Sequence, residues 1–202
     1  MLTAFTAALL LVTISELGDK TFFIAALLAM RHPRRIVFVG VIAALAAMTV
    51  LSVGLGQVVS NLPGHYVHLA TIALFIGFGL KLLYEASRMP EKPLTAEAAD
   101  ARDTIDNSLS RLTGKGGVLT QSFVLTFLAE WGDRTQMTTV TLAASGNPVA
   151  VTTGAIAGHA ICAVIAVMGG RLIAGRISER RLTMIGGGLF VLFGVVTAIE
   201  GA

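Results

Sequence analysis

Six apolar segments, each long enough to cross a bilayer as a helix, dominate this sequence. A membrane-spanning helix needs about 20 apolar residues, and the chain reaches that length six times between short polar connections. The expected spans are residues 2–30, 36–59, 66–86, 117–143, 148–170 and 182–200. Of the 202 residues only 13% are charged, against about a quarter in soluble domains. The sequence therefore predicts an all-α, polytopic membrane protein with six transmembrane helices.

Lysines and arginines gather in alternate connections and so predict the orientation. The first, third and fifth connections hold 12 of the 15 basic residues, and the second and fourth hold none. By the positive-inside rule the basic connections face the cytoplasm, which leaves both termini outside. We expect a multi-pass protein of the cell inner (plasma) membrane. The net charge of +3 does not indicate a nucleic-acid partner, because the basic residues form short clusters between apolar runs.

The second half of the sequence repeats the first. The stretch 16-ELGDKT-21 matches 130-EWGDRT-135 at an offset of 114, and 74-LFIGFGLKLLYE-85 matches 189-LFVLFGVVTAIE-200 at an offset of 115. Matches from one end of a three-span unit to the other indicate a duplication.

A unit with an odd number of spans inserts its second copy upside down. We therefore expect two inverted three-helix repeats, residues 1–86 and 116–202, as in many secondary transporters. Residues 87–115 join them as a solvated cytoplasmic linker, in which 95–112 can form a short helix.

Charged residues inside the first and fourth expected spans mark the candidate site. On a continuous helix, residues three and four apart share a face, so Glu16, Asp19 and Lys20 are expected on one side of their span, and the second motif repeats the arrangement. Ionisable groups within spans face the protein interior and pair with one another. If the two faces oppose each other, four carboxylates and two cationic side chains leave a formal charge of −2, which one divalent cation neutralises. The predicted metal ligands are Glu16, Asp19, Glu130 and Asp133.

Oxygen atoms dominate the motifs and favour a hard cation. The expected supporting residues are Lys20, Thr21, Arg134, Thr135 and Gln136. Carboxylate, hydroxyl and amide oxygens suit Ca²⁺, Mn²⁺ and Mg²⁺, and no His/Cys set adjoins the motifs, which disfavours a zinc or copper site. Carboxylates crowded in a low dielectric can take up protons when the ion leaves, so divalent cation and proton would compete for the same oxygens.

Gly18 and Gly132 stand between the carboxylates of each motif. They either let helices approach closely or permit a local break that exposes backbone carbonyls to the ion. The purely structural alternative is that the charged residues form an ion-paired anchor that holds helices together.

Two copies of E-x-G-D-[KR]-[ST], in two three-span repeats joined by a cytoplasmic linker, resemble the Gdt-type family. This second Ca²⁺:cation antiporter family includes Golgi, chloroplast and bacterial calcium/manganese exchangers. The resemblance covers essentially the whole chain. It implies a divalent cation/proton antiporter in the lipid bilayer, with Mn²⁺ or Ca²⁺ and protons as substrates. It also implies that the four motif carboxylates are the ion ligands and that no cofactor is needed. The sequence is compatible with a homo-oligomer.

Two other functions stay open from the sequence. One is an exporter of another small solute, such as a basic amino acid whose amines the carboxylates would bind. The other is a membrane scaffold in which the motifs only hold helices together. An enzyme is not expected, because the sequence shows no nucleophile–base pair and no metal-hydrolase spacing.

Weaker signals carry structural expectations. Glu85 and Glu200 end the third and sixth spans, either as solvated helix ends or as cation-attracting mouths of the pathway. His159 is expected to be a hydrogen-bonded core histidine, with a proton relay as the alternative, and Cys162 a small buried residue. The stretches Gly154-x-x-x-Gly158 and Gly186–Gly188 indicate close helix packing.

Overall fold

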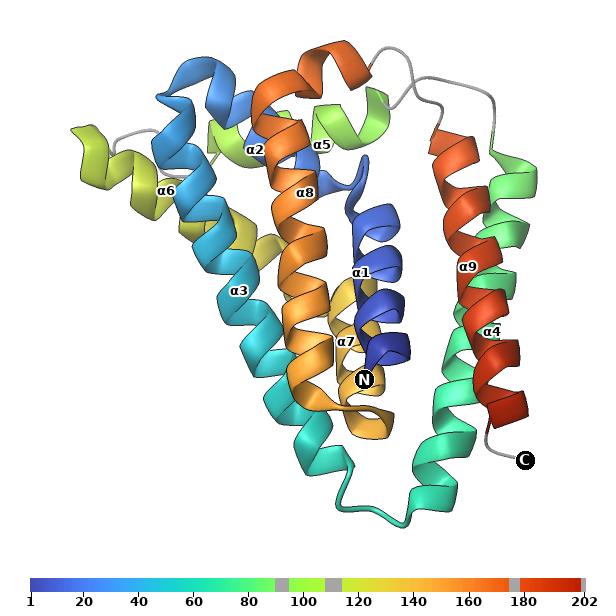
Figure 1. Ribbon diagram of the computed structural model, residues 1–202. Helices are drawn as coiled ribbons and strands as arrows, with labels where there is room; N and C mark the ends of the chain where they lie inside the picture. Colours follow the sequence, from blue (N-terminus) through green and yellow to red (C-terminus); the bar gives the residue numbers. More distant parts are fainter. Residues whose placement is uncertain (90–94, 108–113, 175–178, 201–202) are drawn as a thin grey trace.

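Helices make up nearly all of the part of the chain that the structure describes. The computed structural model describes residues 1–89, 95–107, 114–174 and 179–200 (Figure 1). Its helices are α1 (Leu2–Glu16), α2 (Lys20–Arg31), α3 (Arg34–Val59), α4 (Gly64–Arg88), α5 (Thr95–Asn107), α6 (Gly114–Ala129), α7 (Arg134–Ser145), α8 (Pro148–Ala174) and α9 (Glu179–Glu200). The all-α prediction is confirmed over these residues.

Among the residues that the structure describes, four helices are each long and apolar enough to cross a membrane. They are α3, α4, residues Pro148–Gly169 of α8 and residues Arg180–Ile199 of α9. The pair α1 and α2 adds a fifth candidate span if the two are counted together, although they meet at an angle of 64°.

The expectation of continuous helices over 2–30 and 117–143 is wrong. Both segments break at the charged motif, so that α1 is separated from α2 and α6 from α7. A run of apolar residues looks the same in sequence whether its helix is straight or broken, which is why hydropathy did not reveal the breaks.

Both breaks share one local construction. Gly18 has φ +85° and Gly132 φ +81°, in the left-handed region that residues with a Cβ disfavour. Asp19 and Asp133 follow with extended backbone, φ −77° and −74°, and take the N-cap positions of α2 and α7. Aspartate is favoured there because its carboxylate lies at the positive end of the helix dipole. The motif is therefore a glycine turn followed by an aspartate cap.

This construction corrects the expected geometry of the motif. Glu16 ends α1, Asp19 caps α2 and Lys20 begins α2, so the three residues do not share the face of one helix. Of the two roles expected for the glycines, the structure shows the local break. A Cβ on Gly132 would meet no atom within 4 Å, so close packing does not explain that glycine.

Helices from each half of the chain pack on helices from the other half. α1 and α2 contact α8, whereas α6 and α7 contact α3. α4 and α9 lie side by side at one edge of the molecule (Figure 1). Glycines permit the close contacts, because a Cβ at Gly154 would lie 2.5 Å from the Phe5 carbonyl oxygen and one at Gly187 would lie 3.0 Å from that of Gly79. The packing role expected for these glycine stretches is confirmed at both positions.

Part of the connecting segment docks on the bundle. The expected short helix within 95–112 is confirmed as α5, which packs against α2. Ala101 and Ile105 are buried in the same apolar cluster as Phe22 and Phe23 of α2. This segment is therefore solvated on only part of its surface.

Candidate cation site

The two helix breaks bring three carboxylates together inside the bundle. Glu16, Glu130 and Asp133 each offer one oxygen, and these oxygens lie within 4.8 Å of one another. Both glutamates are only 2% exposed, and Asp133 is half-buried. One hard cation at about 2.0–2.6 Å from each oxygen can span such separations. Three of the four predicted ligands therefore lie where a single ion can contact them.

Threonines of both motifs hold Glu16. The Thr21 hydroxyl donates to Glu16 Oε2 at 2.9 Å, and the Thr135 hydroxyl lies 2.8 Å from Glu16 Oε1. Thr135 Oγ1 is also 3.2 Å from Asp133 Oδ2. All four side chains come from the two motifs, so the supporting role expected for the threonines agrees with their positions.

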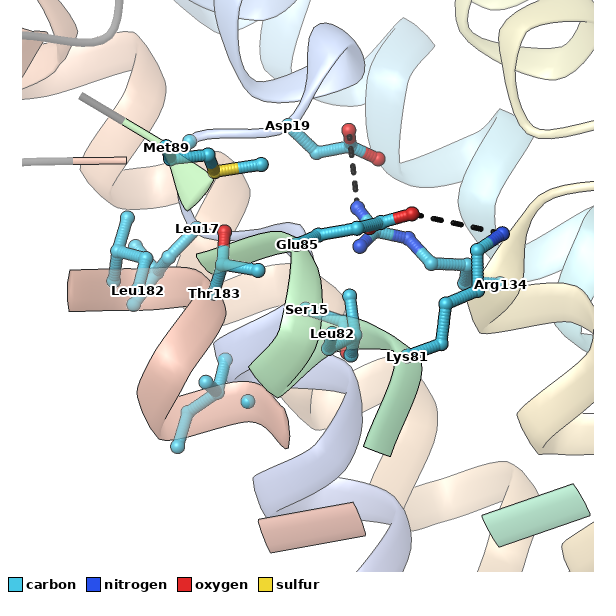
Figure 2. A pocket seen from close by; sticks show the side chains of 13 residues that line it. Ser15, Leu17, Asp19, Lys81, Leu82, Glu85, Met89, Arg134, Leu182 and Thr183 are labelled. Carbon is cyan, nitrogen blue, oxygen red and sulfur yellow. Dashed lines mark ion pairs between the residues drawn. The ribbon is translucent and has the colours of Figure 1, made fainter. Parts of the chain in front are cut away.

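Asp19, the fourth predicted ligand, does not belong to this cluster. Instead it forms an ion pair with Arg134, in which Asp19 Oδ1 lies 3.8 Å from Arg134 Nη2 (Figure 2). Both residues line a cavity of about 300 Å³ together with Lys81 and Glu85 of α4. Lys81 Nζ lies 3.8 Å from Glu85 Oε1, the pairing expected for a solvated helix end. The side chain of Glu200 lies outside the described residues.

Two hydrogen bonds between side chains and backbone stabilise the second break. Gln136 Oε1 accepts a hydrogen bond from the Gly132 N–H at 2.7 Å, and Asp133 Oδ1 accepts from the Arg134 N–H. Lys20, the first residue of α2, is half-buried. In this structure Gln136 thus fixes the backbone around the cluster.

A small cavity beside Glu130 is lined in part by residues that the sequence did not single out as ligands. Its volume is about 10 Å³, room for about one water molecule. Its lining residues are Met48, Thr49, Ser52, Glu130, Thr135, Gln136, Thr139 and His159. Repeat matching gave no signal for His159 or Thr49, because their counterparts at an offset of 115 are Ala44 and Val164.

Two buried polar atoms on this cavity lack hydrogen-bond partners among the described residues. They are Glu130 Oε1 and His159 Nδ1. His159 Nδ1 lies 3.9 Å from Glu16 Oε1, beyond hydrogen-bond distance. The expectation that His159 is a hydrogen-bonded core residue is therefore wrong for this nitrogen.

A second cavity of similar size lies beside Glu16 and has mainly apolar walls. Its volume is about 10 Å³. Cys162 lines it and donates to the Thr13 carbonyl at 3.1 Å, so the cysteine is the small buried residue expected. Each of the two cavities beside the glutamates is about the size of one water molecule, and neither has room for an amino acid.

Buried carboxylates that converge at paired helix breaks, within a bundle of membrane-length helices, are typical of membrane transporters of small cations. Sequence comparison then gives the family. The model of the family described as "Divalent cation/proton antiporter GDT1" matches residues 4–90 and 118–202. The chain belongs to this GDT1 family of multi-pass membrane antiporters, and it is not an enzyme.

Curated relatives agree over nearly the whole chain. The GDT1-like protein sll0615 of Synechocystis sp. is 58% identical over 200 residues, which cover 98% of this chain and 97% of the relative. The chloroplastic Protein PAM71-homolog of Arabidopsis thaliana is 40% identical, over 96% of this chain and 59% of the relative. GDT1-like protein 3 of Oryza sativa subsp. indica is 42% identical, over 95% of this chain and 72% of the relative. No solved structure matches the chain.

Proposed function

We propose that this chain exchanges Mn²⁺ or Ca²⁺ for protons, and that Glu16, Glu130 and Asp133 hold the ion in the conformation described here. One observation carries the proposal: oxygens of these three residues, from both motifs, lie within 4.8 Å of one another. An all-oxygen set at this spacing suits a hard divalent cation.

Proton coupling follows from the burial of the cluster. When the cation leaves, ionised carboxylates remain close together in a low dielectric, which is strongly unfavourable. Protons relieve this repulsion by binding the same oxygens. Cation and protons therefore occupy the site in turn, which is the requirement for antiport.

Two inverted three-helix repeats, with six spans, are the architecture that we propose for this exchange. Each half of the chain has a broken helix followed by two long helices. The packing is reciprocal, since the broken helix of each half contacts the first long helix of the other half. The family match falls into two blocks separated by residues 91–117, which supports residues 87–115 as the linker.

The start of α1 and the α3–α4 connection lie toward one end of the bundle, and α5 lies at the opposite end (Figure 1). Because α5 lies in the Lys/Arg-containing linker, its end of the bundle is the one expected in the cytoplasm. This arrangement supports termini on the external side of an inner (plasma) membrane.

Asp19 and Asp133 suggest how the site alternates between the two sides. Both cap the second half of a broken helix, yet here Asp133 joins the glutamates while Asp19 pairs with Arg134. In an inverted repeat the opposite-facing state exchanges the environments of the two halves. We expect Asp19 to enter the cluster in that state and Asp133 to turn toward Lys20.

Purified protein in liposomes with an imposed pH gradient tests the proposal. Mn²⁺ flux, Ca²⁺ flux and lumenal pH are followed together for the wild type, Asp19→Asn and Asp133→Asn. We expect cation flux coupled to counter-moving protons in the wild type and its loss in both variants. Absence of flux for both ions from folded wild-type protein would contradict the proposal. Full activity in the two variants would remove the aspartates from the site.

A further inference from the structure

His159 is a buried polar residue that the carboxylate site leaves unexplained. The residue is 4% exposed, and its Nδ1 has no hydrogen-bond partner among the described residues. Buried polar atoms without partners are rare in folded proteins, and each calls for a specific explanation such as an ion or a water. His159 is therefore a candidate for contact with something that enters the site.

The position of His159 places its nitrogen close to both glutamates. Nδ1 lies 3.9 Å from Glu16 Oε1, and the side chain shares its small cavity with Glu130, whose Oε1 is also without a partner. A cation at about 2.0–2.6 Å from each ligand bridges a nitrogen and an oxygen 3.9 Å apart. The cavity of about 10 Å³ is large enough for one water-sized particle.

Three hydroxyl groups on the cavity wall have already donated their protons elsewhere. The hydroxyls of Thr49, Ser52 and Thr139 each donate to the carbonyl four residues earlier, at 2.7–2.8 Å. Because each hydroxyl proton is already used, these oxygens face a neighbour only as acceptors. These three acceptor oxygens, beside a carboxylate oxygen and an imidazole nitrogen without partners, suit a cation or a water bound to it.

We infer that His159 is a nitrogen ligand of the transported cation and gives this site a preference for Mn²⁺ over Ca²⁺. The inference rests on the proposed function. Ca²⁺ takes oxygen ligands almost exclusively, whereas neutral imidazole is a common ligand of first-row transition metals. Carboxylates alone accept both ions, so one nitrogen among oxygens is the feature that separates them.

Competition between the two ions in liposomes tests the role of His159. The full chain is compared with His159→Gln, which removes the imidazole nitrogen and keeps a polar side chain. We expect Ca²⁺ transport to persist and the preference for Mn²⁺ over Ca²⁺ to fall about tenfold. His65→Gln controls for loss of an exposed histidine, and Val151→Ala for a change in a buried side chain of the same helix. Both controls are expected to keep the wild-type preference.

A second test measures metal coordination directly and does not require the variant to transport ions. Protein labelled with ¹⁵N-histidine is loaded with Mn²⁺, and pulsed electron paramagnetic resonance measures nitrogen coupling to the metal. Coupling from one histidine, absent in His159→Gln, is the expected result. Bound Mn²⁺ without histidine coupling, or an unchanged ion preference in active His159→Gln, overturns the inference while leaving the antiport proposal intact. Failure of the wild type to transport either ion would instead contradict the proposed function.

Discussion

Thr135 Oγ1 lies 2.8 Å from Glu16 Oε1, although 119 positions separate the two residues in the chain. The contact joins the second motif to the first at the centre of the carboxylate cluster. Each motif is therefore incomplete alone, and the site exists only when the two breaks meet.

Thr135→Val is expected to weaken cation binding by a factor of roughly 10 to 100, because a hydrogen bond to a charged group contributes roughly 1.5–3 kcal/mol. The Mn²⁺ concentration for half-maximal uptake into liposomes measures the effect. Thr135→Ser keeps the hydroxyl group and should retain most of the wild-type affinity. Thr141→Val is the matched control, since the Thr141 hydroxyl on the same helix donates only to the Met137 carbonyl among the bonds observed. Equal uptake curves for Thr135→Val and Thr141→Val would contradict a role of this hydroxyl in the site.

Gly132→Ala is expected to lower the free energy of unfolding by about 1–2 kcal/mol, because Gly132 has φ +81° and a Cβ disfavours that conformation. Thermal unfolding in detergent measures the loss, and Gly132→Asn should lose less, since asparagine tolerates positive φ. Gly54→Ala, on an exposed helical position where a Cβ meets nothing within 4 Å, should be neutral or stabilising. A melting temperature unchanged by Gly132→Ala would indicate that the break does not need glycine.

Mn²⁺ affinity is expected to fall as the pH is lowered, because protons bind the oxygens that must be free to hold the metal. Each proton displaced contributes at most a tenfold change in apparent affinity per pH unit. Titration of purified protein with Mn²⁺ at several pH values, with proton release followed in weak buffer, measures this slope. Glu130→Gln should give a shallower slope than the wild type. Affinity independent of pH would argue against competition between cation and proton.

Ile105→Ala is expected to loosen α5 from α2, since Ile105 is only 4% exposed and truncation of a buried isoleucine costs about 2–5 kcal/mol. Faster limited proteolysis within 95–107 measures the release. Arg102→Ala, an exposed change on the same helix, should leave the cleavage rate near that of the wild type. Identical rates for both variants would mean that α5 does not depend on this contact.

The carboxylates of the candidate site could be predicted from the sequence, because binding a hard cation requires oxygen ligands. The apolar lengths indicated a membrane protein, and carboxylates placed within apolar spans indicated a cation site. The glycine between the carboxylates of each motif also indicated that a local break was one of two possibilities. Even so, hydropathy favoured continuous helices, because it measures the composition of a segment and does not report a change in the direction of the helix axis.

The sequence alone determined that four motif carboxylates lie within apolar surroundings and that the two motifs correspond to each other. Only the tertiary structure decided that Glu16, Glu130 and Asp133 cluster while Asp19 pairs with Arg134. It also decided that His159, with alanine as its repeat counterpart, lies beside the glutamates. Propensities and helix caps act over a few residues, whereas these contacts depend on how helices distant in the chain pack together.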